Sequence, residues 1–234
     1  MERNLNKLII FVLIFTLPVI IFSQHFAYYY GKNKVVKSGF DWQYFDTPNF
    51  RIYHYTNDMK LLKKIAVTAE NGYDKISKYL NIEVEKRIPL IFYKTHVDFE
   101  QTNIYPGFLP TGAQAFAEPV SNRMVLHGDS STEELMRTLI HELGHIFEYQ
   151  VMFKKSSKSL FRFRAPPLWV MEGFSEFITR DWDAFSLLTV RDAVLNDKIP
   201  MLRKSGGMMV ANRSGRAPYD FGHIIYEFIE EKYG

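Results

Sequence analysis

Two histidines four residues apart have the spacing of metal ligands. His141 and His145 belong to the segment HELGH at 141–145, where apolar residues recur at helical spacing. Side chains four apart lie on one face of a helix, so both imidazoles can bind one zinc ion at about 2.0–2.1 Å. Glu142 points about 100° away around the helix, where it can take a proton from a metal-bound water. We therefore interpret the histidines as ligands and Glu142 as a general base; the alternative is an amphipathic helix with two surface histidines.

A catalytic zinc ion usually has three protein ligands and one open position, so a third ligand is required. The extended motif HExxHxxGxxH would supply one, but Glu148 and Val151 stand where its glycine and last histidine would be. The best candidate is Glu172, because it lies among apolar residues, where a carboxylate needs a partner. Glu176 lies one turn later and could accept a hydrogen bond from the outer nitrogen of either histidine. The alternative for both glutamates is a solvated acidic face.

These groups need two helices to position them, and the sequence predicts both. Ser131 and Glu134 form an S-x-x-E capping box ahead of the apolar stripe that contains the histidines. Pro166 and Pro167 open the helix that carries both candidate glutamates, since proline is tolerated in the first turn. Gly144 lies inside the first helix, where glycine costs up to about 1 kcal/mol relative to alanine, which indicates close packing against a neighbour.

The remaining patterns predict an α+β fold. Alternation and short apolar runs predict strands, whereas apolar residues at helical spacing predict helices. The expected strands are 50–55, 89–93 and 122–127, and the other expected helices are 58–80, 96–102, 184–195 and 219–233. Because helices dominate the second half, we expect a mixed-sheet N-terminal lobe, a helical C-terminal lobe and the histidine-bearing helix between them.

Composition excludes several classes of function. The net charge of +3 arises from 29 basic and 26 acidic residues, which gives no case for nucleic-acid binding. The chain has no cysteine, so disulfides, thiolate metal sites and a cysteine nucleophile are excluded. Hydrophobic residues make up 47% of the 234 positions, enough for one sizeable core. The sequence does not indicate an oligomeric state.

The N-terminus is typical of an export signal. Arg3 and Lys7 precede an almost unbroken apolar run at 8–22, which is shorter than the roughly 20 residues that a spanning helix needs. We therefore expect residues 1–24 to be a signal peptide and the protein to be periplasmic or extracellular. The alternative is an uncleaved anchor, which would be the protein's contact with the membrane.

The order of the motifs resembles that of the gluzincin zinc metallopeptidases. In that family the HExxH motif is followed by a segment such as N-E-G-F-A, and here HELGH is followed by W-V-M-E-G-F-S-E at 169–176. The resemblance implies a zincin-like metallopeptidase domain over residues 25–234, Zn²⁺ as the cofactor and Glu172 as the third ligand. Met171 stands where aminopeptidases carry asparagine, and no GxMEN-like segment is present, so we do not expect aminopeptidase activity.

The same resemblance implies a role for a tyrosine near the C-terminus. Tyr219 belongs to a Y-x-x-G segment that, in aminopeptidase-type members, carries the tyrosine that stabilises the tetrahedral oxyanion. A phenol can donate a hydrogen bond to charge that develops in the transition state. The alternative is a half-buried packing tyrosine. His223 lies one turn later and could assist, although a structural histidine is the stronger interpretation.

A second likeness is to the peptidase-MA-type domains that precede TolB-type β-propellers in exported bacterial proteins. Segments at 93–96, 98–102 and 122–126 carry it, and it covers roughly residues 40–234. It implies that the chain continues beyond Gly234, and the apolar face of the last expected helix would otherwise lie exposed. The expected function is zinc-dependent, endopeptidase-like hydrolysis of a peptide or protein substrate. The alternative is a catalytically retired peptidase-fold module that binds envelope partners.

The expected strand at 122–127 is assigned to substrate binding. A gluzincin-like arrangement would place it at the sheet edge along the cleft, where an extended peptide could add through main-chain hydrogen bonds. The alternative is an interior strand that is paired on both sides.

Overall fold

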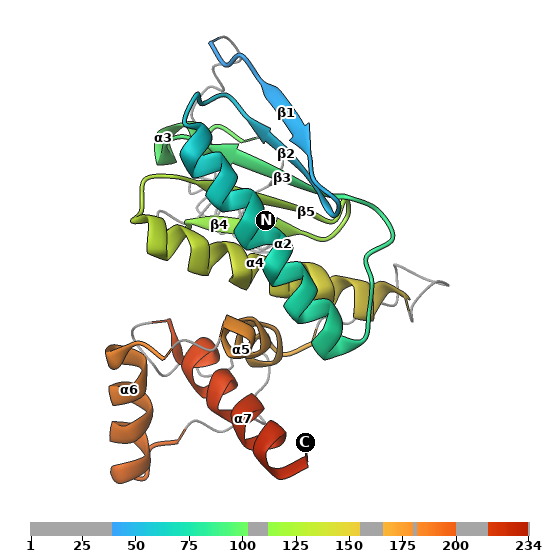
Figure 1. The fold of residues 1–234 in the computed structure, drawn as a ribbon. Coiled ribbons are helices and arrows are strands. Elements are labelled where there is room, and N and C mark those ends of the chain that lie inside the picture. The colour runs from blue at the N-terminus through green and yellow to red at the C-terminus, as the bar shows by residue number, and fades with distance from the viewer. Residues whose placement is uncertain (1–38, 103–111, 155–165, 180–181, 200–214, 234) are drawn as a thin grey trace, which may run out of the picture. The chain divides into compact units, whose positions relative to one another are not determined.

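The computed structural model describes residues 39–102, 112–154, 166–179, 182–199 and 215–233 (Figure 1). Contacts divide the chain into two units, 1–36 and 37–234, and every described residue belongs to the second. The expected signal peptide at 1–24 lies outside the described residues. None of the described helices combines the length and the apolar character that a bilayer crossing needs.

A five-stranded mixed sheet and several helices form the described part of the chain, which confirms the expected α+β class. The strand order is β1-β2-β3-β5-β4, in which the three central strands run parallel and both edge strands run antiparallel to their neighbours (Figure 1). The strands are β1 (Gln43–Asp46), β2 (Phe50–His54), β3 (Ile88–Tyr93), β4 (Ala115–Glu118) and β5 (Arg123–His127). Strands β1 and β4 were not predicted from the sequence.

The expectation that residues 122–127 form a sheet edge is wrong. Strand β5 pairs with β3 on one side and with β4 on the other. Its residues Met124, Val125 and Leu126 are at most 1% exposed, so side chains on both faces are buried. A continuous apolar run of this kind is typical of an interior strand. The edge strand beside the histidine-bearing helix is β4.

The helices begin and end close to the expected positions. Asp58 caps α2 by accepting a hydrogen bond from the main-chain N–H of Leu61. Ser131 Oγ accepts from the N–H of Glu134 at 3.1 Å, which confirms one half of the expected capping box at the start of α4. The helices are α2 (Met59–Leu80), α3 (His96–Phe99), α4 (Thr132–Lys154), α5 (Leu168–Thr179), α6 (Ala184–Leu195) and α7 (Ala217–Tyr233).

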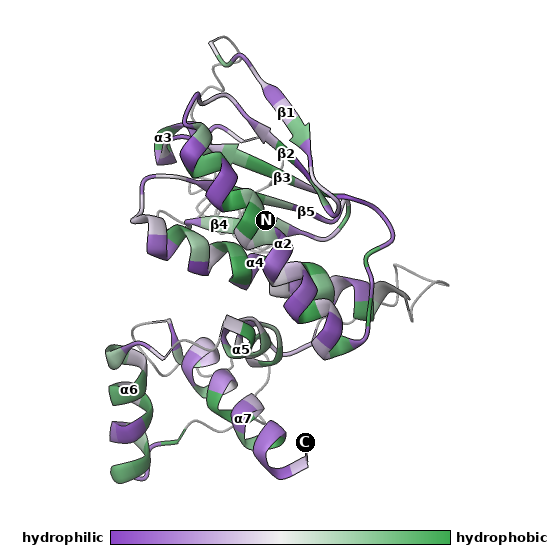
Figure 2. Ribbon diagram, in the orientation of Figure 1, coloured by the Kyte–Doolittle hydropathy of each residue, from purple (hydrophilic) through white to green (hydrophobic). Residues whose placement is uncertain are grey.

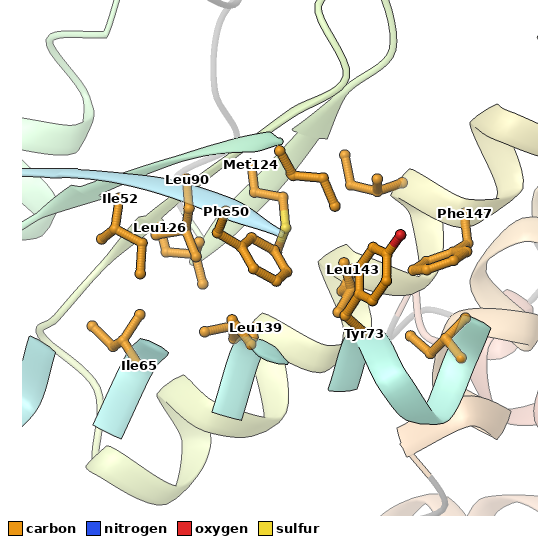
Figure 3. Close-up of a cluster of buried hydrophobic side chains, with 14 of the residues drawn as sticks. Phe50, Ile52, Ile65, Tyr73, Leu90, Met124, Leu126, Leu139, Leu143 and Phe147 are labelled. Carbon is orange, nitrogen blue, oxygen red and sulfur yellow. The ribbon is translucent and has the colours of Figure 1, made fainter. Parts of the chain in front are cut away.

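The main core lies between the sheet and helices α2 and α4, which cover the same face (Figure 1). Central strands β3 and β5 are largely hydrophobic, whereas α2 and α4 carry both kinds of residue (Figure 2). Leu139, Leu143 and Phe147 of α4 point into this core and are fully buried (Figure 3). Burial of this stripe fixes the rotation of α4, so the residues between its members are held on other faces of the helix.

Glycines allow the later helices to pack closely. A Cβ atom on Gly144 of α4 would lie 2.7 Å from Ser175 Oγ of α5, which confirms the expected close packing at that glycine. A Cβ atom on Gly173 of α5 would collide with the main chain of Gly222 in α7. Helix α5 is therefore held between α4 and α7 at distances that only glycine permits.

Candidate metal centre

His141, His145 and Glu172 are brought together in the structure. Each offers one ligand atom, and these three atoms lie within 4.8 Å of one another. His141 Nε2 and His145 Nε2 are 3.2 and 3.3 Å from Glu172 Oε2. Two ligands of a tetrahedral zinc ion at about 2.0–2.1 Å are separated by about 3.3–3.4 Å. The donor set and its spacing therefore fit a metal centre.

The outer nitrogens of the two imidazoles also meet polar groups. His145 Nδ1 lies 2.7 Å from Glu148 Oε2 and 3.1 Å from Ser175 Oγ. His141 Nδ1 faces Glu176 Oε1 at 3.7 Å, which is an ion-pair distance but longer than a hydrogen bond. Glu176 therefore lies beside His141, as expected, without the expected hydrogen bond. In both rings Nε2 faces Glu172, whereas Nδ1 faces polar groups outside the three candidate ligands.

Neither Glu148 nor Ser175 was assigned a role from the sequence. The signal for Glu148 was its position three residues after His145, because side chains three apart are neighbours on a helix. In the comparison with the extended motif, Glu148 stands only in the place of a glycine. Ser175 had no such signal, since it reaches the site by the close crossing of α4 and α5 at Gly144.

The electrostatics of the three grouped residues favour a bound cation. Burial alone would raise the pKa of Glu172, but hydrogen bonds from His141 and His145 outweigh it and lower the pKa to about 2. Burial would lower the pKa of His145, but hydrogen bonds to Glu148 and Glu172 hold it well above the usual value. The carboxylates of Glu148 and Glu172 thus attract a proton to the imidazole of His145, and a metal ion would compete with that proton for a ring nitrogen.

Glu142 lies beside His141, His145 and Glu172, and all four residues line one cleft. Its side chain is buried, and burial raises its pKa, although the nearby charges of His145 and His141 oppose the rise. The main-chain N–H of Ala117 in β4 donates a hydrogen bond to its carboxylate. A carboxylate with a raised pKa is suited to hold a proton during a reaction.

The grouped residues form the floor of a cleft of about 510 Å³ between α4 and β4. Residues 112–117 line one wall, and residues of α5 and α7 complete it. Tyr219 is part of this lining, and its ring stacks on His141 with centroids 6.0 Å apart. Burial, followed by the charge of Glu172, raises the pKa of Tyr219, so its hydroxyl stays protonated. Tyr149, which was not predicted, also lines the cleft and donates a hydrogen bond to the carbonyl of Ala117.

Two arginines that were not predicted lie around Glu176. Arg137 Nη2 and Arg216 Nη2 are each 3.5 Å from its carboxylate. Arg216 also lies 3.4 Å from Asp220 and 5.4 Å from the centroid of the Tyr219 ring. Three helices contribute to this cluster, so no local pattern in the sequence could reveal it.

His223 is not brought to the cleft. It is 3% exposed and stacks on Trp182, with ring centroids 4.2 Å apart and an interplanar angle of 6°. Its Nε2 lies 3.4 Å from Glu227 Oε1. This environment agrees with the structural interpretation of His223 rather than with assistance to Tyr219.

Known proteins provide no further guide to this site. A search of protein-family models, curated proteins and solved structures found no match for this chain. The interpretation of the site therefore rests on its residues and their geometry.

Proposed function

We propose that this protein is a zincin-like, gluzincin-type zinc metallopeptidase. In this proposal His141, His145 and Glu172 bind Zn²⁺, and Glu142 is the general base. The observation that carries the proposal is the group of three ligand atoms within 4.8 Å, in a cleft that Glu142 also lines. Two imidazoles and one carboxylate are the ligand set of many catalytic zinc sites.

The chain's own residues would divide the chemistry among them. Zinc bound at this site would polarise a substrate carbonyl and acidify a water molecule. Glu142 would accept the proton from that water at its carboxylate, and its burial supports this role because burial raises its pKa. Tyr219 would donate a hydrogen bond from its protonated hydroxyl to the negative charge that develops on the carbonyl oxygen.

Strand β4 would hold the substrate as an extended peptide. The N–H of Ala117 bonds Glu142 and its carbonyl bonds Tyr149, so both groups point away from β5 and towards α4. In a strand, residues two apart point their main-chain groups to the same side, so those of Ala115 also face the cleft. A peptide could therefore add to β4 at Ala115. Recognition through the main chain suits a peptide or protein substrate of varied sequence.

The expected export signal supports a site of action outside the cytoplasm. A protein of this kind would be periplasmic or extracellular. A binding module with the same cleft is the competing function, and it would hold peptides without turnover.

Zinc content and casein cleavage test the proposal together. Purified protein should contain about one zinc ion per chain, the usual number for a three-ligand catalytic site. Glu142→Gln should keep the metal and lose cleavage, whereas Glu133→Gln, at an exposed position in the first turn of α4, should keep both. Zinc-loaded wild-type protein that cleaves casein no faster than Glu142→Gln would favour the binding module. Absence of bound zinc would exclude both the centre and the peptidase.

A further inference from the structure

The two histidines of the proposed centre are held in different ways. His141 has no acceptor within hydrogen-bond distance at Nδ1 among the described contacts, because Glu176 is 3.7 Å away and is shared with two arginines. His145 has two partners at the same atom. We propose that Glu148 and Ser175 are the positioning residues that hold His145 for the metal, an inference that rests on the proposed zinc site.

The geometry at His145 determines which nitrogen is free to bind. Glu148 Oε2 lies 2.7 Å from Nδ1, a distance typical of a charge-assisted hydrogen bond. A carboxylate accepts only, so the neutral imidazole that binds a metal would carry its proton on Nδ1 and present the lone pair of Nε2. That nitrogen is the one that faces Glu172, at 3.3 Å. Glu148 therefore selects the tautomer that can bind a metal together with Glu172.

Burial makes this interaction strong. The side chain of Glu148 is 11% exposed, that of His145 is 10% exposed, and Ser175 is fully buried. A buried carboxylate is costly unless it is paired, and His145 is its ion-pair partner among the described residues. Glu148 also lines a largely apolar cavity of about 480 Å³, together with Val151 and Met171. An apolar side chain at this position would therefore have apolar neighbours.

Gly144 explains how Ser175 reaches the ring. A Cβ atom at position 144 would lie 2.7 Å from Ser175 Oγ and 3.2 Å from Ser175 Cα. Absence of a side chain there lets α5 approach α4 until the serine hydroxyl is 3.1 Å from His145 Nδ1. Ser175 is also three residues after Glu172 on α5, so one helix supplies a ligand and a positioning group. The alternative is an ordinary ion pair between residues three apart on a helix, which would stabilise α4 and have no effect on the metal.

The test is a measurement of zinc affinity by competition with a chromogenic chelator. Glu148→Met removes the acceptor but suits the apolar cavity, and it should weaken zinc binding roughly 10- to 100-fold. Glu148→Gln keeps an acceptor oxygen without the charge, so its zinc affinity should lie between those of Glu148→Met and the wild type. Ser175→Ala leaves the short bond between His145 and Glu148, so it should lose less zinc affinity than Glu148→Met. Glu133→Gln, an exposed position on the same helix, serves as the matched control and should be unchanged.

A second readout separates positioning from simple stabilisation. Glu148→Gln should reduce the rise in unfolding temperature that zinc produces, when each protein is compared with its own chelator-treated form so that any stability lost with the ion pair cancels. If wild-type protein binds zinc and neither Glu148 variant binds it more weakly, the positioning role is overturned and the metal site stands. If the wild type binds no zinc, the proposed function and this inference both fail. Should Glu148→Met not fold, Glu148→Gln and Ser175→Ala decide the question by the same measurement.

Discussion

The crossing of α5 and α7 predicts a stability loss from a single methyl group. A Cβ atom on Gly173 would collide with main-chain atoms of Gly222, and main-chain atoms cannot rotate away as a side chain can. Gly173→Ala must therefore push the two helices apart. This crossing is next to Glu172 on α5 and near Tyr219 on α7, so the change would also disturb the cleft.

Two opposing terms set the magnitude. Alanine is better than glycine inside a helix by roughly 1 kcal/mol, whereas overpacking costs roughly 1–3 kcal/mol. Because the collision involves the main chain, we expect the overpacking cost to be near the upper end of that range. The free energy of unfolding should then fall by about 1–2 kcal/mol. For a domain of this size, that loss lowers the unfolding temperature by about 2–8 °C.

Urea unfolding and thermal unfolding measure these quantities directly. Gly112→Ala is the control, because among the described residues a Cβ atom there would have no neighbour within 4 Å, and it should change stability by no more than about 0.5 kcal/mol. Gly222→Ala affects the same crossing and should resemble Gly173→Ala. A Gly173→Ala protein that is as stable as the wild type, or more stable as helix propensity alone predicts, would refute the close crossing.

Three other changes test the site and its surroundings. Glu172→Ala should lose bound zinc on desalting, and full zinc occupancy would show that another residue is the third ligand. Ala115→Pro removes one main-chain donor from the cleft-facing edge of β4, so kcat/KM for a peptide should fall roughly two- to tenfold with zinc content unchanged; an unchanged value would argue against strand addition there. Burial and then the charge of His96 lower the pKa of His127. The imidazole of His127 therefore binds a proton less readily in the folded protein than in the unfolded chain. Stability should therefore decrease as the pH falls below about 6.5, and the decrease should be smaller in His127→Gln, as measured by urea unfolding of the two proteins between about pH 5 and 7.

The proposed ligands could be predicted from the sequence because their geometry is local. His141 and His145 need only a helix to lie on one face, and the capping box and apolar stripe predict that helix. Glu172 lies on a different helix, and its prediction depended on the family resemblance and on its apolar neighbours. The structure brings all three together. Glu148 could have been predicted by the same local reasoning from its three-residue spacing to His145.

Contacts that depend on how helices pack were not predictable. Arg137, Glu176 and Arg216 come from three parts of the chain and meet only because α4, α5 and the start of α7 converge. In the sequence the two arginines look like surface charges, and Glu176 was expected only as a partner of a histidine. The glycines gave partial information, since Gly144 indicated close packing but not its partner. Local spacing thus predicts which residues share a face, whereas tertiary packing decides which faces meet.

Strand β4 shows how the site and the fold depend on each other. Its sequence, Ala-Phe-Ala-Glu, contains two alanines and no β-branched residue, so strand propensity is low and the pattern gave no prediction. Its conformation comes instead from pairing with β5 and from hydrogen bonds between Ala117 and two residues of α4, Glu142 and Tyr149. Glu142 therefore has two roles in our proposal, as general base and as a partner of the strand that would hold the substrate. Because the carboxylate of Glu142 is bonded to β4, the proposed base and a peptide bound along β4 would be held in fixed register with each other.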